Sequence, residues 1–402
     1  MTYADYALLV GLVFVPILAA AVDIIPASRA TRGVVFPIPD DHRSNDDFTV
    51  LVPIYGNIKY LENVDFLRPY SRRIVLVTTT SESRDFDRAL DEIAKENSFT
   101  VYRAHVKRNP TKKGGRNTSG TIRDRIIREA TECAVSTEFV VCIDADTVTD
   151  RPIGEIVGAL EANGLDLASV RLVPSNTDRL LGKLQSHEYR MVMRLRKILP
   201  WVCSGAFHLG RHDAHREIMK RHSLFFQGND VELGLIGDEM GYKVGHLTFD
   251  VPTAVPDRPV AWLRQRVAWS GGEFRLFIAN PQLALRHPFY FFYGGIVVIL
   301  MCPFRWMTLI QPGYDLITVL FIYWTILVAV NWRHRDWTLF VYPIYGMFNS
   351  LVMVPIGLVS YLWMAIPEGN WGWIRLSVHR TRHRRSEPEP ATATLMSEVV
   401  AP

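Results

Sequence analysis

The sequence predicts an α/β fold in which a mostly parallel sheet is covered by helices and apolar segments lie at both ends of the chain. Short runs rich in Val and Ile recur between residues 48 and 173, and stretches with helical periodicity separate several of them. Strands that alternate with helices favour a parallel sheet, because each parallel neighbour needs a crossover connection. Ligands bind such sheets beyond the carboxyl ends of the strands, so polar residues there are the first candidates for chemistry.

Five segments are predicted as buried strands, because each is short and apolar and is bounded by polar or turn residues. They are Phe48–Ile54, Ile74–Thr79, Phe99–Ala104, Phe139–Ile143 and Leu167–Val173. Helices are predicted over Thr118–Thr131 and Ile153–Ala162, and another begins near Asn229 and ends near Gly241. In Arg190–Lys197 charged and apolar residues alternate, which we interpret as an amphipathic surface helix.

Composition excludes several classes of protein. The 402 residues carry a formal net charge of only +4, and no basic stripe interleaved with aromatic residues is present, so we expect no nucleic-acid partner. The four cysteines form no CxxC pair, and the spacing of the histidines matches no compact site, which argues against a zinc site and a disulfide scaffold.

The N-terminal apolar run, Tyr6–Val22, predicts a membrane anchor over residues 1–30. No basic residue precedes it, whereas Arg29 and Arg32 follow it, so the positive-inside bias places the next domain in the cytoplasm. A signal anchor is favoured over a cleaved signal, although the small residues Ala19–Ala21 keep the second interpretation open.

A second apolar region, residues 289–366, predicts C-terminal transmembrane segments. It contains three runs: Phe289–Ile310, Tyr314–Val330 and Trp337–Ala365. A basic tail follows over residues 367–402, partly disordered by composition, and its charge places it in the cytoplasm. Three full crossings would leave that tail outside, so the number of crossings stays open.

Asp144 and Asp146 directly follow the predicted strand Phe139–Ile143. Residues two apart in an extended segment point the same way, so the two carboxylates can share one site. Paired carboxylates at a sheet edge suit a hard cation with oxygen ligands, Mg²⁺ or Mn²⁺. The alternative is a pair of turn acids without a ligand. Upstream, the basic segment Lys112–Asn117 precedes a helix, where its cations and backbone N–H groups could meet a phosphate.

With these two segments, Val52–Asn57, Gln227–Glu232 and Gln265–Gly272 resemble, in order, the motifs of the processive membrane glycosyltransferases of family 2, such as cellulose, chitin and hyaluronan synthases. The resemblance covers roughly residues 48–272 and the apolar segments around them. It implies a GT-A fold, which is Rossmann-like, and an inverting transfer from a UDP-sugar with the help of Mg²⁺ or Mn²⁺.

The resemblance also implies the roles of individual residues. Asp144 and Asp146 would hold the metal, and Asp230 would take the proton from the acceptor hydroxyl. Asp144 would also contact the donor, together with Pro53, Tyr55, Asn57, Lys112, Lys113, Arg116, Asn117, Gln265 and Arg266, and the acceptor would contact Ser204, Gly205 and Trp269. Two alternatives stay open: Asp230 could only cap its helix, and Trp269 could only anchor the chain at a membrane interface.

Three positions depart from the family pattern. The stretch Thr78–Glu82 lacks the second-strand acid that usually contacts uracil, Asn229 stands where an acid is common, and Ala268 replaces the second arginine of Q-R-x-R-W. The first departure leaves the base of the nucleotide open, and the last weakens the case for processive synthesis.

The predicted protein is a multi-pass enzyme of the inner or plasma membrane. Residues 45–255 form its cytoplasmic GT-A domain, and residues 256–288 form an interfacial segment. Its partners would be a nucleotide-sugar donor, a glycan or lipid-linked acceptor, membrane lipids and accessory export subunits. The first hypothesis is synthesis of a polysaccharide coupled to export, and the second is transfer of a single sugar to a lipid-linked acceptor. A membrane scaffold or transporter is disfavoured, because the three acids are intact and the apolar part lacks the buried charges of a transport path.

Overall fold

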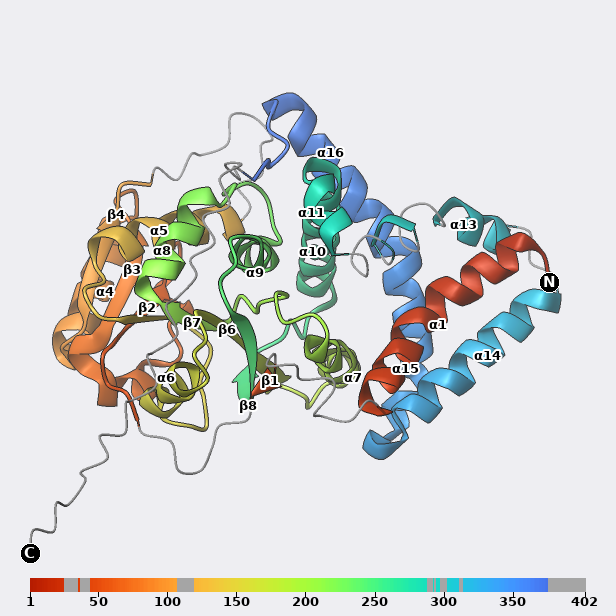
Figure 1. The fold of residues 1–402 in the computed structure, drawn as a ribbon, viewed down its shortest axis with the longest axis horizontal. Helices are drawn as coiled ribbons and strands as arrows, with labels where there is room; N and C mark the ends of the chain where they lie inside the picture. The colour runs from red at the N-terminus through yellow and green to blue at the C-terminus, as the bar shows by residue number, and fades with distance from the viewer. Residues whose placement is uncertain are drawn as a thin grey trace, which may run out of the picture.

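A single mixed sheet organises the chain (Figure 1). The computed structural model describes residues 1–24, 35–36, 44–106, 119–287, 292, 294–296, 302–310 and 314–374. Its sheet has eight strands in the order β1-β8-β6-β7-β5-β2-β3-β4. The bounds are β1 Val35–Phe36, β2 Phe48–Pro53, β3 Ile74–Thr79, β4 Thr100–Ala104, β5 Phe139–Ile143, β6 Leu167–Pro174, β7 Phe207–Arg211 and β8 Val244–Thr253. Neighbouring strands pair in parallel except at β7, which is antiparallel to both β5 and β6.

The predicted α/β architecture is confirmed, and all five predicted strands are present. Three strands were not predicted: the two-residue β1, and β7 and β8. β7 is short and contains a histidine and a glycine, and β8 contains Gly245 and Pro252, which are uncommon inside strands. Tertiary pairing rather than local propensity therefore makes these two segments extended.

Both faces of the sheet are buried. On β5 the side chains of Phe139, Val141 and Ile143 join one buried cluster, while Val140 and Cys142 join the other. The first cluster includes residues of α3 Val64–Leu67, α4 Arg84–Asn97 and α6 Ile153–Ala162, and the second includes residues of α5 Ser119–Cys133, α8 His212–Arg221 and α9 Asn229–Glu239. Burial on both sides explains why the central strands read as continuous apolar runs.

The antiparallel strand β7 begins beside the carboxyl end of β5 and runs back along it. The chain leaves β6 and passes through α7 Leu180–Arg194 and the 3₁₀ turn η3 Leu195–Lys197. It then enters β7 at Phe207, opposite Ile143 at the carboxyl end of β5. Residues just before β7 therefore lie beside the residues just after β5, and the Asp144 N–H donates to the Ala206 carbonyl at 2.9 Å.

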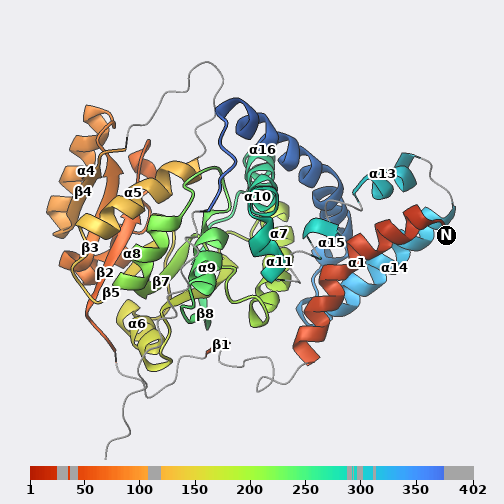
Figure 2. The same cartoon turned by 45° about the horizontal axis from the view of Figure 1, so that its top comes forward.

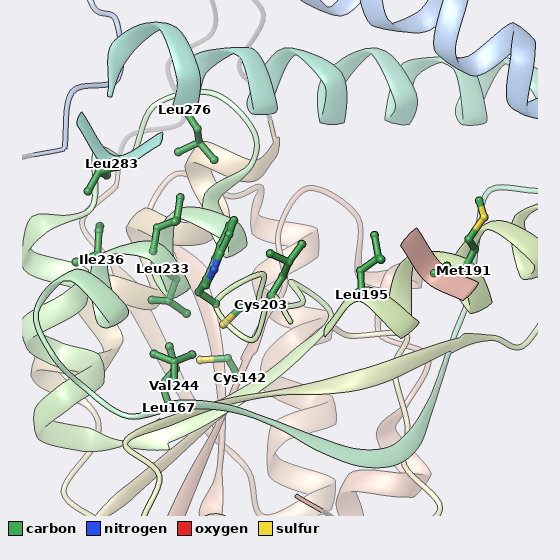
Figure 3. Close-up of a cluster of buried hydrophobic side chains, with 14 of the residues drawn as sticks. Cys142, Leu167, Met191, Leu195, Cys203, Leu233, Ile236, Val244, Leu276 and Leu283 are labelled. Carbon is green, nitrogen blue, oxygen red and sulfur yellow. The ribbon is translucent and has the colours of Figure 1, made fainter. Parts of the chain in front are cut away.

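Two long helices lie beside the sheet domain, α10 Pro259–Ala279 and α16 Val354–Glu368 (Figures 1 and 2). Glycines allow their backbones to approach closely, since a Cβ at Gly357 would lie 2.8 Å from the Gly271 N atom. Leu276 of α10 and Leu283 of α11 Pro281–Arg286 cover Leu233 and Ile236 of α9, which in turn lie over the sheet residues (Figure 3). The α10 helix is thereby packed against the face of the sheet that α9 covers.

Apolar helices gather at the end of the molecule away from β4, with α1 and α14 side by side (Figures 1 and 2). The elements of this apolar part are α1 Tyr3–Ile24, α13 Cys302–Ile310, α14 Tyr314–Val330, the 3₁₀ turn η5 Trp332–His334, α15 Trp337–Phe348 and the π segment η6 Asn349–Met353. Two further 3₁₀ turns lie between β2 and β3 in the chain: η1 Ile58–Tyr60 and η2 Arg68–Arg73. Arg305 is only 1% exposed and donates to the Ser350 hydroxyl at 2.9 Å, so the expectation that this part buries no charge is wrong.

Within the described residues, two helices are long and apolar enough to cross a membrane: Tyr3–Ile24 and the continuous helix Trp337–Glu368, with mean hydropathies of 2.5 and 1.7. Length and composition alone are weak evidence for membrane association, and the predicted multi-pass arrangement is not supported. The basic run at residues 379–385 of the predicted cytoplasmic tail lies outside the described residues.

Candidate active site

The turn after β5 presents the two predicted metal ligands. Thr147 N–H donates to the Asp144 carbonyl at 3.1 Å, which closes the turn. The buried Asn63 side chain holds both ends of this turn, because its amide donates to the carbonyls of Asp144 and Thr147 at 3.0 and 2.8 Å. The turn that carries both acids is therefore rigid, as a pre-organised site requires.

Asp144 is paired with a cation that the sequence did not reveal. Arg123 of α5 donates through Nε to Asp144 Oδ1 at 2.9 Å, and through Nη2 to the Gly205 carbonyl at 2.5 Å. Burial opposes the charge of this guanidinium, but Asp144 and Asp124 together raise the pKa of Arg123 above its ordinary value. Arg123 therefore stays charged and joins the acidic turn to the loop before β7.

Asp146 has the properties of a metal ligand in need of a cation. Its side chain reaches solvent and accepts a hydrogen bond from the Thr147 hydroxyl at 3.2 Å. Burial, then the negative charge of Asp144 and more weakly of Glu62, raises the pKa of Asp146. A hard divalent cation would relieve this crowding, so the oxygen donors present fit Mg²⁺ or Mn²⁺.

Asp230 lies in the first turn of α9, whose N-cap is Gly228 at a φ of 82°. The α9 cap carries no side-chain hydrogen bond, and no described residue donates to the Asp230 carboxylate. A Cβ at Gly205 would lie 3.5 Å from Asp230 Oδ2, so the glycine leaves open space beside this carboxylate. Capping is therefore not the role that the structure gives Asp230, and its oxygens are available to a ligand.

Asn229 explains one departure from the family pattern. It is buried, and its amide donates to the Asp124 carboxylate of α5. Burial raises the pKa of Asp124, and the nearby Asp230 raises it further, while Arg123 and His222 lower it. An acid at position 229 would meet the Asp124 carboxylate directly, so a neutral donor is what this site accommodates.

A buried ion pair fixes the start of α9 to α10. Arg275 and Glu232 both have side chains with 0% exposure and are joined by an ion pair, and Arg275 also donates to the Ser223 hydroxyl. Burial alone would raise the pKa of Glu232, but Arg275 and His222 lower it overall. The backbones are also close, since a Cβ at Gly272 would lie 2.6 Å from the carbonyl carbon of Gln227.

The α10 helix carries a charged and an aromatic side chain that contact each other, Arg266 and Trp269. Arg266 is buried, pairs with Glu188 at 2.7 Å and lies over the Trp269 ring at 4.6 Å. Trp269 is 39% exposed and lies 6.3 Å from the Tyr189 ring. Burial raises the pKa of Tyr189, Arg266 opposes this, and the negative charges of Glu188, Asp230 and Asp146 raise it further.

Several predicted contact residues are used within the protein. Arg266 is held by Glu188 and Gln185, the Ser204 hydroxyl donates to the Val170 carbonyl at 3.1 Å, and the Asn57 side chain caps the 3₁₀ turn η1. Each of these three side chains therefore has at least one partner within the protein. Gln265 is half-buried on α10, next to Arg266.

Pro53 ends β2, and Tyr55 follows it half-buried at the same sheet edge. Glu82, which follows β3, accepts the Gly56 N–H at 3.0 Å and the Thr79 hydroxyl at 2.8 Å. It therefore brings an acid to the edge at which the family's second-strand acid is missing. Four predicted donor contacts lie outside the described residues: Lys112, Lys113, Arg116 and Asn117.

Folding also brings together a buried group that spacing concealed. Cys142, His208 and His215 have ligand atoms within 4.8 Å of one another, and Cys142 and His208 are direct partners across β5 and β7. His208 Nε2 and His215 Nε2 are 3.4 Å apart. The histidines are thus less scattered than the sequence indicated, because strand register places them together.

Arg123, Asp124, Asn63 and Glu188 are the site residues that sequence reasoning missed. The Arg123–Asp144 and Asn229–Asp124 contacts join residues 21 and 105 positions apart, and no motif links them. The stretch Arg190–Lys197 was interpreted wrongly in part: α7 ends at Arg194, and Arg196 in η3 is buried rather than at the surface.

The chain is similar to known proteins both in part of its sequence and in its fold. Residues 139–334, which begin with β5 and include Asp230 and Trp269, match the family described as Glycosyl transferase family group 2. Among solved structures the chain is similar to the mannosyltransferase PcManGT from Pyrobaculum calidifontis in complex with GDP-Man and Mn²⁺, at 15% identity and a TM-score of 0.54, over 90% of this chain and 98% of that one.

A weaker likeness, with a TM-score of 0.37 and 12% identity, relates 79% of this chain to 91% of S. aureus TarS 1-349, and it supports no argument on its own. A search of the curated proteins finds no match. The match of residues 139–334 to this family model and the GT-A-like fold together support a glycosyltransferase.

Proposed function

We propose that the protein is an inverting, metal-dependent glycosyltransferase that moves a sugar from a nucleotide-sugar, in the first instance a UDP-sugar, to an acceptor hydroxyl at a membrane surface. The observation that carries this proposal is the convergence of Asp144, Arg123, Gly205 and Asp230 at the carboxyl edge of β5. A transferase needs a fixed acid for the donor side and an unengaged carboxylate for the acceptor side, and this edge offers both.

Asp146 and Asp144 would hold the cation. When bound, a divalent cation supplies positive charge to the diphosphate that departs from the sugar. Arg123 adds a fixed positive charge on the same side, since it is hydrogen-bonded to Asp144. Asp230 accepts the proton of the acceptor hydroxyl as its oxygen attacks the anomeric carbon, and attack from the face opposite the diphosphate inverts that centre.

Trp269 is suited to contact a sugar, because it is partly exposed and its ring is held by Arg266. Sugars have apolar faces that pack on aromatic rings. The same ring could instead meet a membrane interface, as the sequence also allows. Sugar transfer by the Trp269→Ala variant, measured up to high acceptor concentration, separates these roles. Only the loss of a surface that binds the sugar changes the KM for the acceptor.

The product follows from the acceptor, for which two candidates remain. A growing polysaccharide, coupled to export with accessory subunits, follows from the family resemblance and the apolar helices. Addition of a single sugar to a lipid-linked acceptor is favoured by Ala268, which stands where the family pattern has a second arginine. Product length separates the two.

The deciding experiment is nucleotide release by the purified protein in detergent, against UDP- and GDP-sugars with Mg²⁺ or Mn²⁺. The GDP-sugars are included because the similar mannosyltransferase was solved with GDP-Man and Mn²⁺. Release from one donor should fall about 10²–10⁴-fold in Asp230→Asn, the usual contribution of a general base, and should stop when EDTA removes the metal. Release that survives both changes would refute the assigned roles.

A further inference from the structure

The buried group of Cys142, His208 and His215 has no part in the proposed transfer. Cys142 and His215 are 0% exposed and His208 is 3% exposed. The three residues come from β5, β7 and α8 respectively. Because Cys142 and His208 are direct partners across the two strands, their side chains leave the sheet on one face, and α8 packs there. Three separate elements therefore bring one thiol and two imidazoles together inside the protein.

The donor atoms of this group are spaced much like the ligands of a metal ion. His208 Nε2 and His215 Nε2 lie 3.4 Å apart, and Cys142 Sγ lies 3.9 Å from His215 Nε2. A tetrahedral ion at about 2.0–2.1 Å from nitrogen and about 2.3 Å from sulfur separates two nitrogens by about 3.3 Å, and a nitrogen from a sulfur by about 3.6 Å. The imidazole nitrogens already have this separation, and the sulfur is only slightly farther from His215 than a bound ligand would be.

Thr131 fixes which nitrogen of His215 faces the group. The Thr131 hydroxyl donates its one proton to the Ile127 carbonyl at 2.8 Å. His215 Nδ1 lies 3.3 Å from the same hydroxyl oxygen, so this nitrogen is the donor of that hydrogen bond. The Nε2 atom of His215 then presents a lone pair to Cys142 and His208. A ring whose second nitrogen is held in this way is typical of histidines that bind metals.

The surroundings suit a thiophilic cation. Burial lowers the pKa of both histidines, that of His215 to about 3, so both rings are neutral, which is the form that binds metals. Burial raises the pKa of the Cys142 thiol to about 12, but a coordinated metal ion displaces a thiol proton outright. Thiolate and imidazole ligands favour Zn²⁺ or Cu⁺ over the hard ions that carboxylates prefer.

We propose that Cys142, His208 and His215 bind a thiophilic metal ion, Zn²⁺ or Cu⁺, separate from the Mg²⁺ or Mn²⁺ of the acidic turn. On binding, the Cys142 sulfur bonds to the ion and its proton passes to water. The ion would join β5, β7 and α8 directly behind the acidic turn, since the Asp144 N–H donates to the Ala206 carbonyl just before His208. Its role is to stabilise this edge of the sheet, and it does not depend on sugar transfer.

The test measures the zinc and copper content of the purified full chain after gel filtration in excess Mg²⁺. We expect about one thiophilic ion per chain in the wild type and almost none in Cys142→Ser or His215→Gln. The matched control is Cys133→Ser, at an exposed thiol of α5, which should keep the ion. Removing the ion with a zinc- or copper-selective chelator should lower the unfolding midpoint of the wild type, and Mg²⁺ or Mn²⁺ should not restore it.

A wild type that retains neither metal after incubation with Zn²⁺, or with Cu⁺ under reducing conditions, overturns the assignment. So does a metal content that Cys142→Ser leaves unchanged, or a wild-type midpoint that the chelators do not move. If Cys142→Ser fails to fold, Co²⁺ added to Cys133→Ser decides: a cobalt–thiolate absorption in the near ultraviolet supports the site, and its absence overturns it. A protein that retains the ion but releases no nucleotide from any donor supports this site while refuting the proposed function.

Discussion

Removing Arg275 should be among the most damaging changes away from the reacting groups. Its partner Glu232 has a side chain with 0% exposure, so Arg275→Met leaves a carboxylate inside the protein without its counter-ion. His222 also lies near this carboxylate, with its Nδ1 3.7 Å from Glu232 Oε1. It has backbone partners as well, since its Nε2 lies 2.8 Å from the Asn229 carbonyl oxygen and its Nδ1 accepts the Leu224 N–H.

The expected cost is about 3–5 kcal/mol, the range found when one partner of a buried ion pair is removed. For a domain of this size that corresponds to a fall of about 5–15 °C in the unfolding midpoint. Because Glu232 lies in the first turn of α9, next to Asp230, catalysis should suffer as well. The double variant Arg275→Met/Glu232→Gln should recover much of the loss, since neither charge then remains buried.

The loss should depend on pH in a defined direction. In the wild type the pKa of Glu232 is lowered, so the stability from its charged form is present above the unfolded carboxyl pKa and is lost as pH falls through the folded value. Without Arg275, burial dominates and raises that pKa, so the penalty is largest at neutral pH and shrinks as acid protonates the carboxyl group.

Thermal unfolding in detergent, followed from about pH 5 to about pH 8, measures the effect. The matched control is Arg179→Met, which breaks an ion pair with Asp257 whose side chains are 67% and 38% exposed and should cost at most about 1 kcal/mol. If Arg275→Met is no worse than this control, or if its deficit does not shrink in acid, the buried pair does not have the role assigned to it.

Two further predictions concern the start of α9. Asn229→Asp places a second carboxylate against Asp124, whose pKa is already raised, so the two carboxyl groups should share a proton at low pH. The unfolding midpoint of the variant should therefore fall further below that of the wild type as pH rises, and an offset that stays constant with pH would contradict this. Gly272→Ala puts a Cβ 2.6 Å from the Gln227 backbone and should destabilise the protein by about 1–3 kcal/mol while slowing nucleotide release, and wild-type values in both measurements would mean that α9 and α10 are not held at this distance.

The metal turn shows how far a local pattern can lead. Phe139–Ile143 is apolar and β-branched, and it is a strand with the predicted bounds. The two acids after it had to lie at the sheet edge, because a parallel strand ends there. Their counter-ion could not be predicted, because Arg123 reaches Asp144 only after α5 has packed on the face shared by Val140 and Cys142.

The loop before β7 shows the opposite case. Nothing in Cys203-Ser204-Gly205 predicts a strand reversal, yet β7 runs antiparallel between β5 and β6 and brings Gly205 against Asp230. The family resemblance pointed to these residues for the acceptor, but the Ser204 hydroxyl is taken by the Val170 carbonyl. Motif order alone could not show this, because a hydrogen bond between side chain and sheet depends on register.

The sequence by itself determined the α/β class and five of the strands, since these depend on periodicity along the chain. It also predicted Asp144, Asp146 and Asp230 as site residues, the last of them through the family resemblance. Only the tertiary structure decided the partners: Arg123 for Asp144, Asp124 for Asn229 and Arg275 for Glu232. The physical reason is that ionic and polar partners act over a few ångströms in space. Chain separations of 21 to 105 residues leave no trace of such contacts in a local pattern.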